Sequence, residues 1–311
     1  MNIELSQNNH LKWGYNGIPG SIRQSPYDKF FIQYGKIQRE LDFRNACIET
    51  ANEISKKAEN DKKKPLIFFS GGIDSEAIIY SFLLAKKDFS VVHIRYGPNF
   101  NNHEFDYVKT IVGKHDIDIK IFEIDTLKYL NNPENFDLAL RDNSIFLELN
   151  LLCGVTKNIR DKFFPVLDHP GTYLCREDTN VNLPGRWYYK DYEHLMFYYN
   201  HCVNESMSGC PSFYHWSPEI LYGFLTDPLI KNLTDGVFPG KITNRTSTLK
   251  LYQNTFPEFN FMSRSKYTGH EFIDKEILNK FHFRLYSKLK YNRHSAQRYE
   301  YSEIVNLLRN T

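Results

Sequence analysis

A short apolar segment that runs into a Ser-Gly turn and then into a helical pattern constrains the fold of this chain most. The apolar residues Leu66–Phe69 are followed by the turn Ser70–Ser75, and an apolar stripe of helical period then extends from Ala77 to Ala85. Four consecutive apolar residues are typical of a strand buried on both faces, as in a parallel sheet. The sequence therefore predicts a strand, a turn and a helix, with the turn at the carboxyl end of a parallel strand.

The turn has the composition of a phosphate-binding loop. Gly71 and Gly72 lack the Cβ atoms that would keep an anion away from the backbone. The helix that follows presents unpaired N–H groups and a partial positive charge, and Ser70 and Ser75 add hydroxyl donors. Asp74 by itself would repel phosphate, so we expect it to hold a Mg²⁺ ion that bridges to the phosphates. The loop is suited to a magnesium-complexed polyphosphate.

The sequence Ser-Gly-Gly-Ile-Asp-Ser of this turn resembles the Ser-Gly-Gly-x-Asp-Ser signature of the PP-loop ATP pyrophosphatases. That group includes asparagine synthetase, NAD synthetase, 7-cyano-7-deazaguanine synthase and phosphoadenylylsulfate reductase. The loop lacks the Gly-Lys-Ser/Thr ending of a Walker motif. The resemblance implies ATP and Mg²⁺ as cofactors and cleavage of ATP between its α and β phosphates, with Asp74 as a catalytic and metal-binding residue. The residues it assigns to ATP are Ser70, Gly71, Gly72, Ile73, Asp74 and Ser75.

Strands and helices alternate around this loop. Apolar residues at helical spacing predict a helix over 39–59, and 91–96 and 120–125 have the composition of two further strands, with a helix over 103–115 between them. This alternation predicts an α/β fold with a doubly wound, mainly parallel sheet, in which ligands bind outside the carboxyl ends of the strands. The resemblance implies a sheet of the adenine nucleotide alpha hydrolase type.

A candidate metal-binding segment follows a predicted fourth strand. A long helical pattern over 136–160 leads into 163–167, where Pro165 indicates a sheet edge or a bulge. Asp168 comes directly after this strand, and Glu177 follows shortly. Asparagine-synthetase-like members have an acidic loop in the equivalent place that helps hold the metal and the pyrophosphate, so Asp168 and Glu177 are candidate metal ligands. The alternative is that both are solvated loop acids.

Two further groups of residues are candidates for contact with ATP. The resemblance implies that the end of the second strand supports adenine and ribose, which selects Arg95 and Tyr96, with His93 nearby. In the C-terminal half, Arg264 and Lys266 are candidate catalytic residues, because positive charge can stabilise the charge that develops on leaving pyrophosphate. A structural or surface role is the alternative for each group.

The chain divides by composition into three parts. Residues 1–38 show no sustained period and predict an irregular N-terminal arm, 39–180 hold the nucleotide-binding domain, and 181–311 form an aromatic-rich, mostly helical region. The dense aromatic residues between 187 and 224 favour a core, and the alternative is a cap that binds the acceptor. Basic residues over 281–301 favour docked helices with basic outer faces, and nucleic-acid binding is left open but not favoured.

Composition narrows the cellular setting. The 311 residues carry a formal net charge of +2, and no apolar run approaches the ~20 residues of a membrane helix. No signal-peptide pattern follows Met1, so we expect a cytoplasmic protein that does not bind membranes. The five cysteines are scattered without a CxxC pair, which favours reduced thiols and disfavours sulfur transfer.

These observations lead to one main functional hypothesis. The chain is expected to be an asparagine-synthetase-like ligase that adenylates a carboxylate or amide oxygen of a small-molecule or nucleobase acceptor and releases AMP after attack by a second nucleophile. No cysteine follows Met1 directly, as a glutaminase domain would require, so nitrogen would come from ammonia, another amine or a separate subunit. A homo-oligomer is left open. The alternatives are a nucleotide-binding scaffold with reduced catalysis and an enzyme that modifies a nucleobase or nucleic acid.

Overall fold

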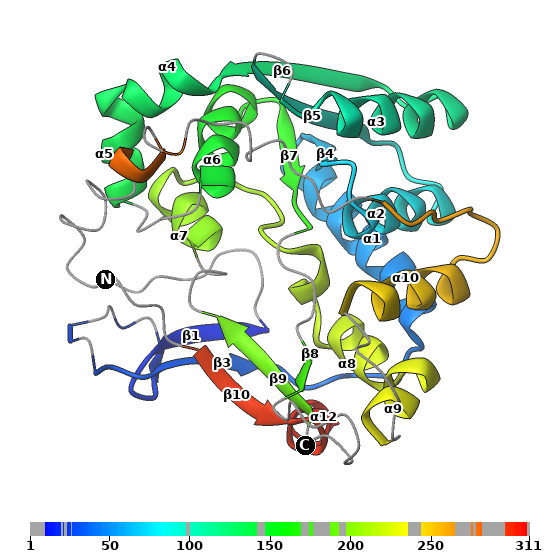
Figure 1. Cartoon of the computed structure of the whole chain (residues 1–311). Helices are drawn as coiled ribbons and strands as arrows, with labels where there is room; N and C mark the ends of the chain where they lie inside the picture. The colour runs from blue at the N-terminus through cyan, green and yellow to red at the C-terminus, as the bar shows by residue number, and fades with distance from the viewer. Residues whose placement is uncertain are drawn as a thin grey trace.

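A four-stranded parallel sheet in the order β6-β5-β4-β7 carries the predicted loop (Figure 1). Its strands are β4 (Lys64–Phe68), β5 (Ser90–Gly97), β6 (Ile119–Asp125) and β7 (Phe163–Val166), as the sequence predicts. This computed structural model describes residues 10–19, 21, 24–25, 27–97, 100–141, 147–168, 174–176, 187–192, 197–235, 244–264, 275, 278–281 and 296–309.

Helices cover both faces of this sheet. The helices nearest to it are α1 (Phe43–Asn60), α2 (Ile73–Leu84), α3 (Asn102–Lys114), α6 (Leu147–Ile159) and α7 (Phe197–Asn204). Successive side chains of a strand point to opposite faces. Accordingly, Ile67 of β4 belongs to the core built with α1, α2 and α3, whereas Leu66 and Phe68 belong to a second core with α6 and α7. The doubly wound α/β fold is confirmed.

The order of the strands places a switch point beside β4. From β4 the chain moves through α2 to β5 on one side, and it later returns to the other side of β4 as β7. In such sheets the ligand crevice lies outside the carboxyl ends of the strands at this point. The loop that follows β4 and the segment that follows β7 therefore meet at the expected ligand site.

Pro165 is compatible with its strand because β7 is the last strand in the sheet order. On the outer side of β7, Cys210 forms an isolated parallel bridge to Val166, and the N–H of Phe213 donates to the carbonyl of Leu167. These contacts lay the segment around 210–213 beside β7, which brings the start of the second region close to the loop.

The N-terminal arm contains regular structure, unlike the irregular arm that the composition predicts. Strands β1 (Leu11–Tyr15), β2 (Ile18–Pro19) and β3 (Phe30–Tyr34) form an antiparallel sheet. The sheet is tied to the C-terminal part of the chain, since the Tyr299 hydroxyl donates to the Ile32 carbonyl at 2.8 Å. The alternating burial of β3 shows that this sheet has one buried face, a period that the many Asn, Gly and Pro residues nearby concealed in the sequence.

The second region is helical over much of its described length but also contains strands. Besides α7, its described helices include α8 (Pro218–Thr226), α9 (Pro228–Asp235), α10 (Asn244–Thr255) and α12 (Tyr301–Arg309). Its strands β9 (Trp187–Tyr192) and β10 (Ala296–Glu300) form an antiparallel sheet with β8 (Leu174–Arg176), which precedes the region. The mostly helical composition predicted for 181–311 does not hold for β9, and the helices predicted over 281–301 are wrong for 296–300. Aromatic residues favour strands where a partner strand is present, and pairing of β9 with β10 supplies it.

Within the helix predicted over 136–160, the described residues form α5 (Pro133–Arg141) and α6, with 142–146 outside the described residues, and Gly154 does not interrupt α6. Together with α4 (Thr126–Asn131), these helices carry the chain from β6 to β7. Among the described helices, none is long and apolar enough to cross a membrane.

Helix α8 packs closely on the start of α1 at Gly223. A Cβ atom there would lie 3.0 Å from both the Leu41 carbonyl oxygen and the Phe43 Cα. Because backbone atoms cannot move aside as a side chain can, we expect Gly223→Ala to lower the free energy of unfolding by about 1–3 kcal/mol, measured by denaturant titration. Gly113→Ala in α3 is the control, since a Cβ there meets nothing within 4 Å. An unchanged stability for Gly223→Ala would contradict this close packing.

Candidate functional site

The loop after β4 adopts a conformation that requires glycine. Gly71 has a φ of +89°, in the left-handed region that side chains disfavour. A Cβ at Gly71 would also lie 3.3 Å from the Cβ and the carbonyl oxygen of Glu104 in α3. The first glycine of the signature therefore serves both the turn and the close approach of α3.

The serine hydroxyls of the loop bond to each other and to its backbone. The two hydroxyl oxygens of Ser70 and Ser75 are 3.1 Å apart, the Gly72 N–H donates to the Ser70 hydroxyl at 3.1 Å, and the Ser75 hydroxyl donates to the Gly72 carbonyl at 3.2 Å. Helix α2 then starts at Ile73 without a side-chain cap. The start of this helix is therefore a place that favours an anion, as the sequence predicts for polyphosphate.

Asp74 is held by two tyrosines from the second region. The Tyr252 hydroxyl, from α10, donates to Asp74 Oδ1 at 2.7 Å, and the Tyr214 hydroxyl, from the short 3-10 helix η2 (Phe213–His215), donates to the Asp74 carbonyl at 2.7 Å. The two hydroxyl oxygens are 2.9 Å apart. Sequence analysis missed both residues, because their aromatic rings suggested a core and only the fold brings their hydroxyl groups to the loop.

Asp168 lies beside Asp74 at the end of β7. Burial, and after it the charge of the Asp74 carboxylate, raise the pKa of Asp168 to about 7, while hydrogen bonds from its own backbone and from the Ser75 side chain work in the opposite direction. Two carboxylates at close range disfavour each other's charge, and a divalent cation between them removes this penalty. Mg²⁺ prefers one or two carboxylates together with phosphate oxygens. Asp74 and Asp168 therefore fit the expected metal, with Glu177 outside the described residues.

Arg264 reaches the first turns of α2, where it pairs with a buried carboxylate. Its Nη2 donates to Glu76, which is fully buried and also accepts a hydrogen bond of 2.6 Å from Tyr80. The guanidinium carbon lies 3.4 Å from the centroid of the Tyr107 ring. Nε and Nη1 of Arg264 are buried and have no hydrogen-bond partner among the described residues. Lys266, the other predicted basic residue, lies outside the described residues.

Arg95 points toward β6 and α3. Its guanidinium donates to Glu123 at 2.7 Å and to Asn102 at 3.0 Å, and it lies 4.7 Å from the centroid of the Phe105 ring. Tyr96, on the opposite face of β5, packs against the cores that contain α6. Within the described structure, Arg95 joins β5 to β6 and α3, and Tyr96 joins β5 to the cores that contain α6.

His93 is oriented toward the loop. Its Nδ1 lies 2.8 Å from the Phe69 carbonyl, and because a carbonyl only accepts, Nδ1 carries the hydrogen and Nε2 has a lone pair. Nε2 is buried without a hydrogen-bond partner among the described residues. Burial lowers the pKa of His93, which keeps the ring neutral.

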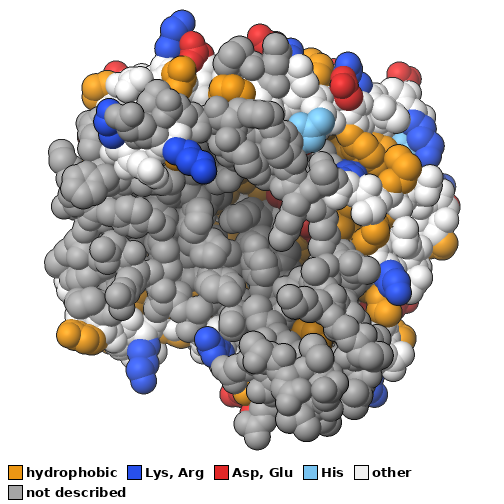
Figure 2. Space-filling view, in the orientation of Figure 1, with side chains coloured by type: hydrophobic (Ala, Val, Ile, Leu, Met, Phe, Trp, Pro, Cys, Tyr) orange, Lys and Arg blue, Asp and Glu red, His pale blue; other side chains and the backbone are white. Residues whose placement is uncertain are grey.

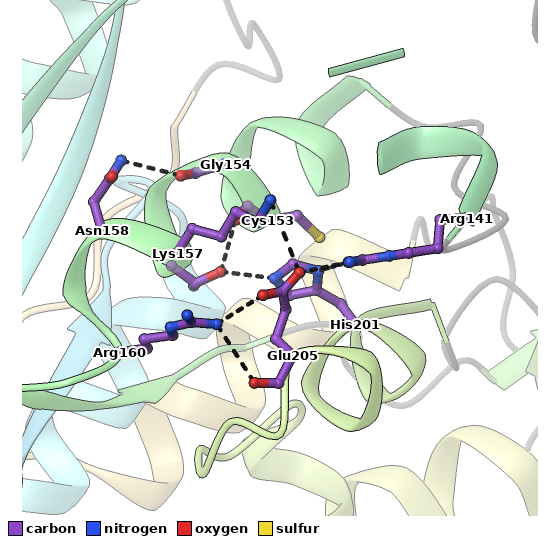
Figure 3. Close-up of polar contacts among 9 residues, drawn as sticks. Arg141, Cys153, Gly154, Lys157, Asn158, Arg160, His201 and Glu205 are labelled. Atoms are coloured by element: carbon purple, nitrogen blue, oxygen red, sulfur yellow. Dashed lines mark hydrogen bonds and ion pairs between the residues drawn. The ribbon is translucent and has the colours of Figure 1, made fainter. Parts of the chain in front are cut away.

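A second cluster of charges surrounds Glu205, away from the loop signature. Figure 3 shows Arg141 and Arg160 pointing to its carboxylate from different helical segments, at 2.6 and 2.7 Å, with Lys157 at 3.9 Å. Although burial works in the opposite direction, these cations hold the pKa of Glu205 below its ordinary value. The buried His201 lies alongside and bonds to Thr156. The cluster ties α5, α6 and α7 together.

The charged side chains on the face shown in Figure 2 are dispersed. The described Lys and Arg side chains lie apart from one another, most of them toward the rim of this view, and do not merge into one basic patch. This arrangement agrees with the nearly neutral formal charge of +2 for the whole sequence.

Comparison with known proteins supports the assignment of the loop. Residues 64–148 match the family model of the queuosine biosynthesis protein QueC, and no curated protein sequence matches the chain. Among solved structures, NMN synthetase from Francisella tularensis aligns with 14% identity and a TM-score of 0.35, over 82% of this chain and 98% of that chain. An NH3-dependent NAD synthetase from Campylobacter jejuni aligns with 14% identity and a TM-score of 0.34, over 80% of this chain and 95% of that chain.

The family-model match covers β4, the loop, β5 and β6 with the helices between them, and it ends before β7 and Asp168. It confirms the superfamily that the signature predicts. Residues 64–148 of this chain are thus similar to a family of PP-loop ATP pyrophosphatases.

The raised pKa of Asp168 makes stability depend on pH. Its folded value of about 7 exceeds the ordinary value of 3.8, so between these values the folded protein holds a proton that the unfolded chain has released. Stability conferred by this proton is lost as pH rises from about 4 to about 7. Because one pKa unit corresponds to about 1.4 kcal/mol, we expect Asp168→Asn to be more stable than the wild type by about 2–4 kcal/mol at pH 8 and nearly equal at pH 4.

Denaturant titrations at both pH values, without ATP or metal, measure this difference. Asp161→Asn is a matched control, because the Asp161 side chain is 94% exposed. If Asp168→Asn changes the free energy of unfolding equally at the two pH values, the pKa of Asp168 is not raised in the folded protein, and the prediction is wrong.

Proposed function

We propose that this chain is an ATP-dependent enzyme that transfers the adenylyl group of ATP to an oxygen of a carboxylate or amide acceptor and releases pyrophosphate. The acceptor oxygen forms a bond to the α-phosphorus, and the bond from that phosphorus to the bridging oxygen of the β-phosphate breaks. A second nucleophile, ammonia or another amine, then displaces AMP. The observation that carries this proposal is the position of the Ser70–Ser75 loop with Asp74 and Asp168 at the switch point of the sheet.

The residues of the site have separate tasks in this reaction. The first N–H groups of α2 and the hydroxyls of Ser70 and Ser75 bind the β and γ phosphates. Mg²⁺ held by Asp74 and Asp168 would offset the negative charge of these phosphates when ATP is bound. Nε and Nη1 of Arg264 have no hydrogen-bond partner among the described residues, and their N–H groups would stabilise the leaving pyrophosphate.

A second candidate differs only in the acceptor. The family model that matches residues 64–148 is named for queuosine biosynthesis, which favours a nucleobase-like acceptor whose carboxylate or amide is adenylated. A panel of small carboxylic acids, nucleobases and RNA, each tested for stimulation of AMP formation, separates this candidate from a ligase for another small molecule.

A nucleotide-binding scaffold without turnover is the remaining candidate. The pair Asp74 and Asp168 argues against it, because two close carboxylates cost stability in the absence of a cation and a scaffold gains nothing from them. Absence of AMP formation with every acceptor of the panel, together with intact ATP binding, would favour the scaffold.

We expect Asp74→Ala to weaken magnesium-dependent ATP binding by at least ~10-fold, since loss of a charge-assisted contact costs about 1.5–3 kcal/mol. Isothermal titration calorimetry with ATP, with and without Mg²⁺, measures this change. The control is Asp88→Ala, whose side chain is 84% exposed and pairs with Lys64. Unchanged Mg-ATP affinity in Asp74→Ala would disprove the site.

The nucleotide product identifies the bond that breaks. We expect AMP and pyrophosphate in equal amounts, because the loop lacks the Walker lysine of enzymes that transfer or release the γ-phosphate. Ion-exchange chromatography of reactions with the active acceptor measures both products. ADP as the main nucleotide product would overturn the proposed mechanism.

A further inference from the structure

Two residues that bond to Asp74, Tyr214 and Tyr252, come from the second region. Tyr252 belongs to α10, and the Tyr214 hydroxyl lies 2.9 Å from the Tyr252 hydroxyl. Each tyrosine also bonds to Asp74, one to its carboxylate and one to its carbonyl, at 2.7 Å in both cases. Burial raises the pKa of each tyrosine well above its ordinary value. Both hydroxyl groups therefore stay protonated at neutral pH and can donate hydrogen bonds.

The chain that follows Tyr252 continues along α2. Phe259 stacks on Tyr80 with 3.8 Å between ring centroids, and Phe261 meets the same ring edge-on at 5.0 Å. Arg264 then pairs with Glu76 one helical turn before Tyr80. The segment 252–264 thus packs along the first turns of α2. The contact between Tyr252 and Asp74 is one of several contacts that this segment makes with α2.

The Tyr252 ring is placed by apolar contacts that do not involve its hydroxyl. It stacks against Phe43 and Phe261 at interplanar angles of 24° and 23°. A ring held in this way presents its hydroxyl at a defined position, so the bond to Oδ1 sets the plane of the Asp74 carboxylate. Groups that orient a metal ligand through a hydrogen bond commonly change metal affinity by 10-fold or more when they are removed.

We propose that Tyr252 is a positioning residue that orients the Asp74 carboxylate for Mg²⁺, so that metal-dependent ATP binding requires the second region to be docked on α2. This inference rests on the proposed function, because it assumes that Asp74 binds the metal. It adds a specific role for the second region: that region completes the nucleotide site through a hydroxyl group.

The test is the Mg²⁺ concentration at which ATP binding is half-maximal, measured by calorimetry on the full chain. In Tyr252→Phe the ring and its stacking remain, and we expect this concentration to rise about 10-fold, with ATP affinity in the absence of Mg²⁺ unchanged within about twofold. Tyr198→Phe is the matched control, because it removes a buried hydroxyl that has no hydrogen-bond partner among the described residues. We expect no change in that variant.

A double-mutant cycle separates orientation of Asp74 from general support of the fold. If Tyr252 acts through the carboxylate, Tyr252→Phe has less than a twofold effect in an Asp74→Asn background. A full effect in that background, or an equal loss of ATP affinity with and without Mg²⁺, overturns the positioning role while leaving the proposed function intact. No change of magnesium dependence in Asp74→Asn alone overturns the metal role on which both proposals rest.

Thermal unfolding, monitored by circular dichroism, shows whether the Tyr252→Phe variant is folded. If it is not, Tyr214→Phe provides the same test, because it removes the hydroxyl that neighbours Tyr252 and bonds to the Asp74 carbonyl. We expect half-maximal binding in Tyr214→Phe to require about threefold more Mg²⁺. An unchanged requirement in Tyr214→Phe would then overturn the proposal.

Discussion

Parallel pairing of β4 with β5 on one side and β7 on the other is the constraint on which the site depends. Because β4 lies between two partners and is buried on both faces, its register is set by two ladders and two cores. The end of β4 is therefore a fixed point, and the loop that follows starts from it. Asp168 is equally fixed by the end of β7, so the approach of the two carboxylates follows from backbone pairing.

The second region is attached to this fixed point through buried polar groups as well as through apolar packing. Glu76 is a fully buried carboxylate in α2, and it accepts hydrogen bonds from Tyr80 and Arg264. Breaking such a pair leaves an uncompensated charge and commonly costs about 3–5 kcal/mol. The aromatic residues that stack on Tyr80 exclude water from this pair, so apolar packing and charge pairing hold the same segment against α2.

The sequence predicted those parts of the fold that local patterns determine. The strand, turn and helix around Ser70–Ser75 were recognised because an apolar run and a glycine turn act over neighbouring residues. The strands β9 and β10 were missed because their pairing joins residues more than a hundred positions apart, and aromatic helices and strands have similar composition. Asp168 was proposed as a candidate from its place after a strand, whereas the contact of Tyr252 with Asp74 could not be predicted, since the hydroxyl reaches Asp74 only after α10 has docked.

The electrostatics of the site favour a ligand of one kind. Asp74 and Asp168 are held near each other by the sheet, and burial together with the charge of Asp74 raises the pKa of Asp168, so a second negative charge is unfavourable in the protein without ligand. The N–H groups at the start of α2 favour an anion a short distance away. A cation alone leaves these N–H groups unused, and phosphate alone is repelled by the carboxylates. A polyphosphate complexed with a divalent cation satisfies both, so the two halves of the site select the complex over either component.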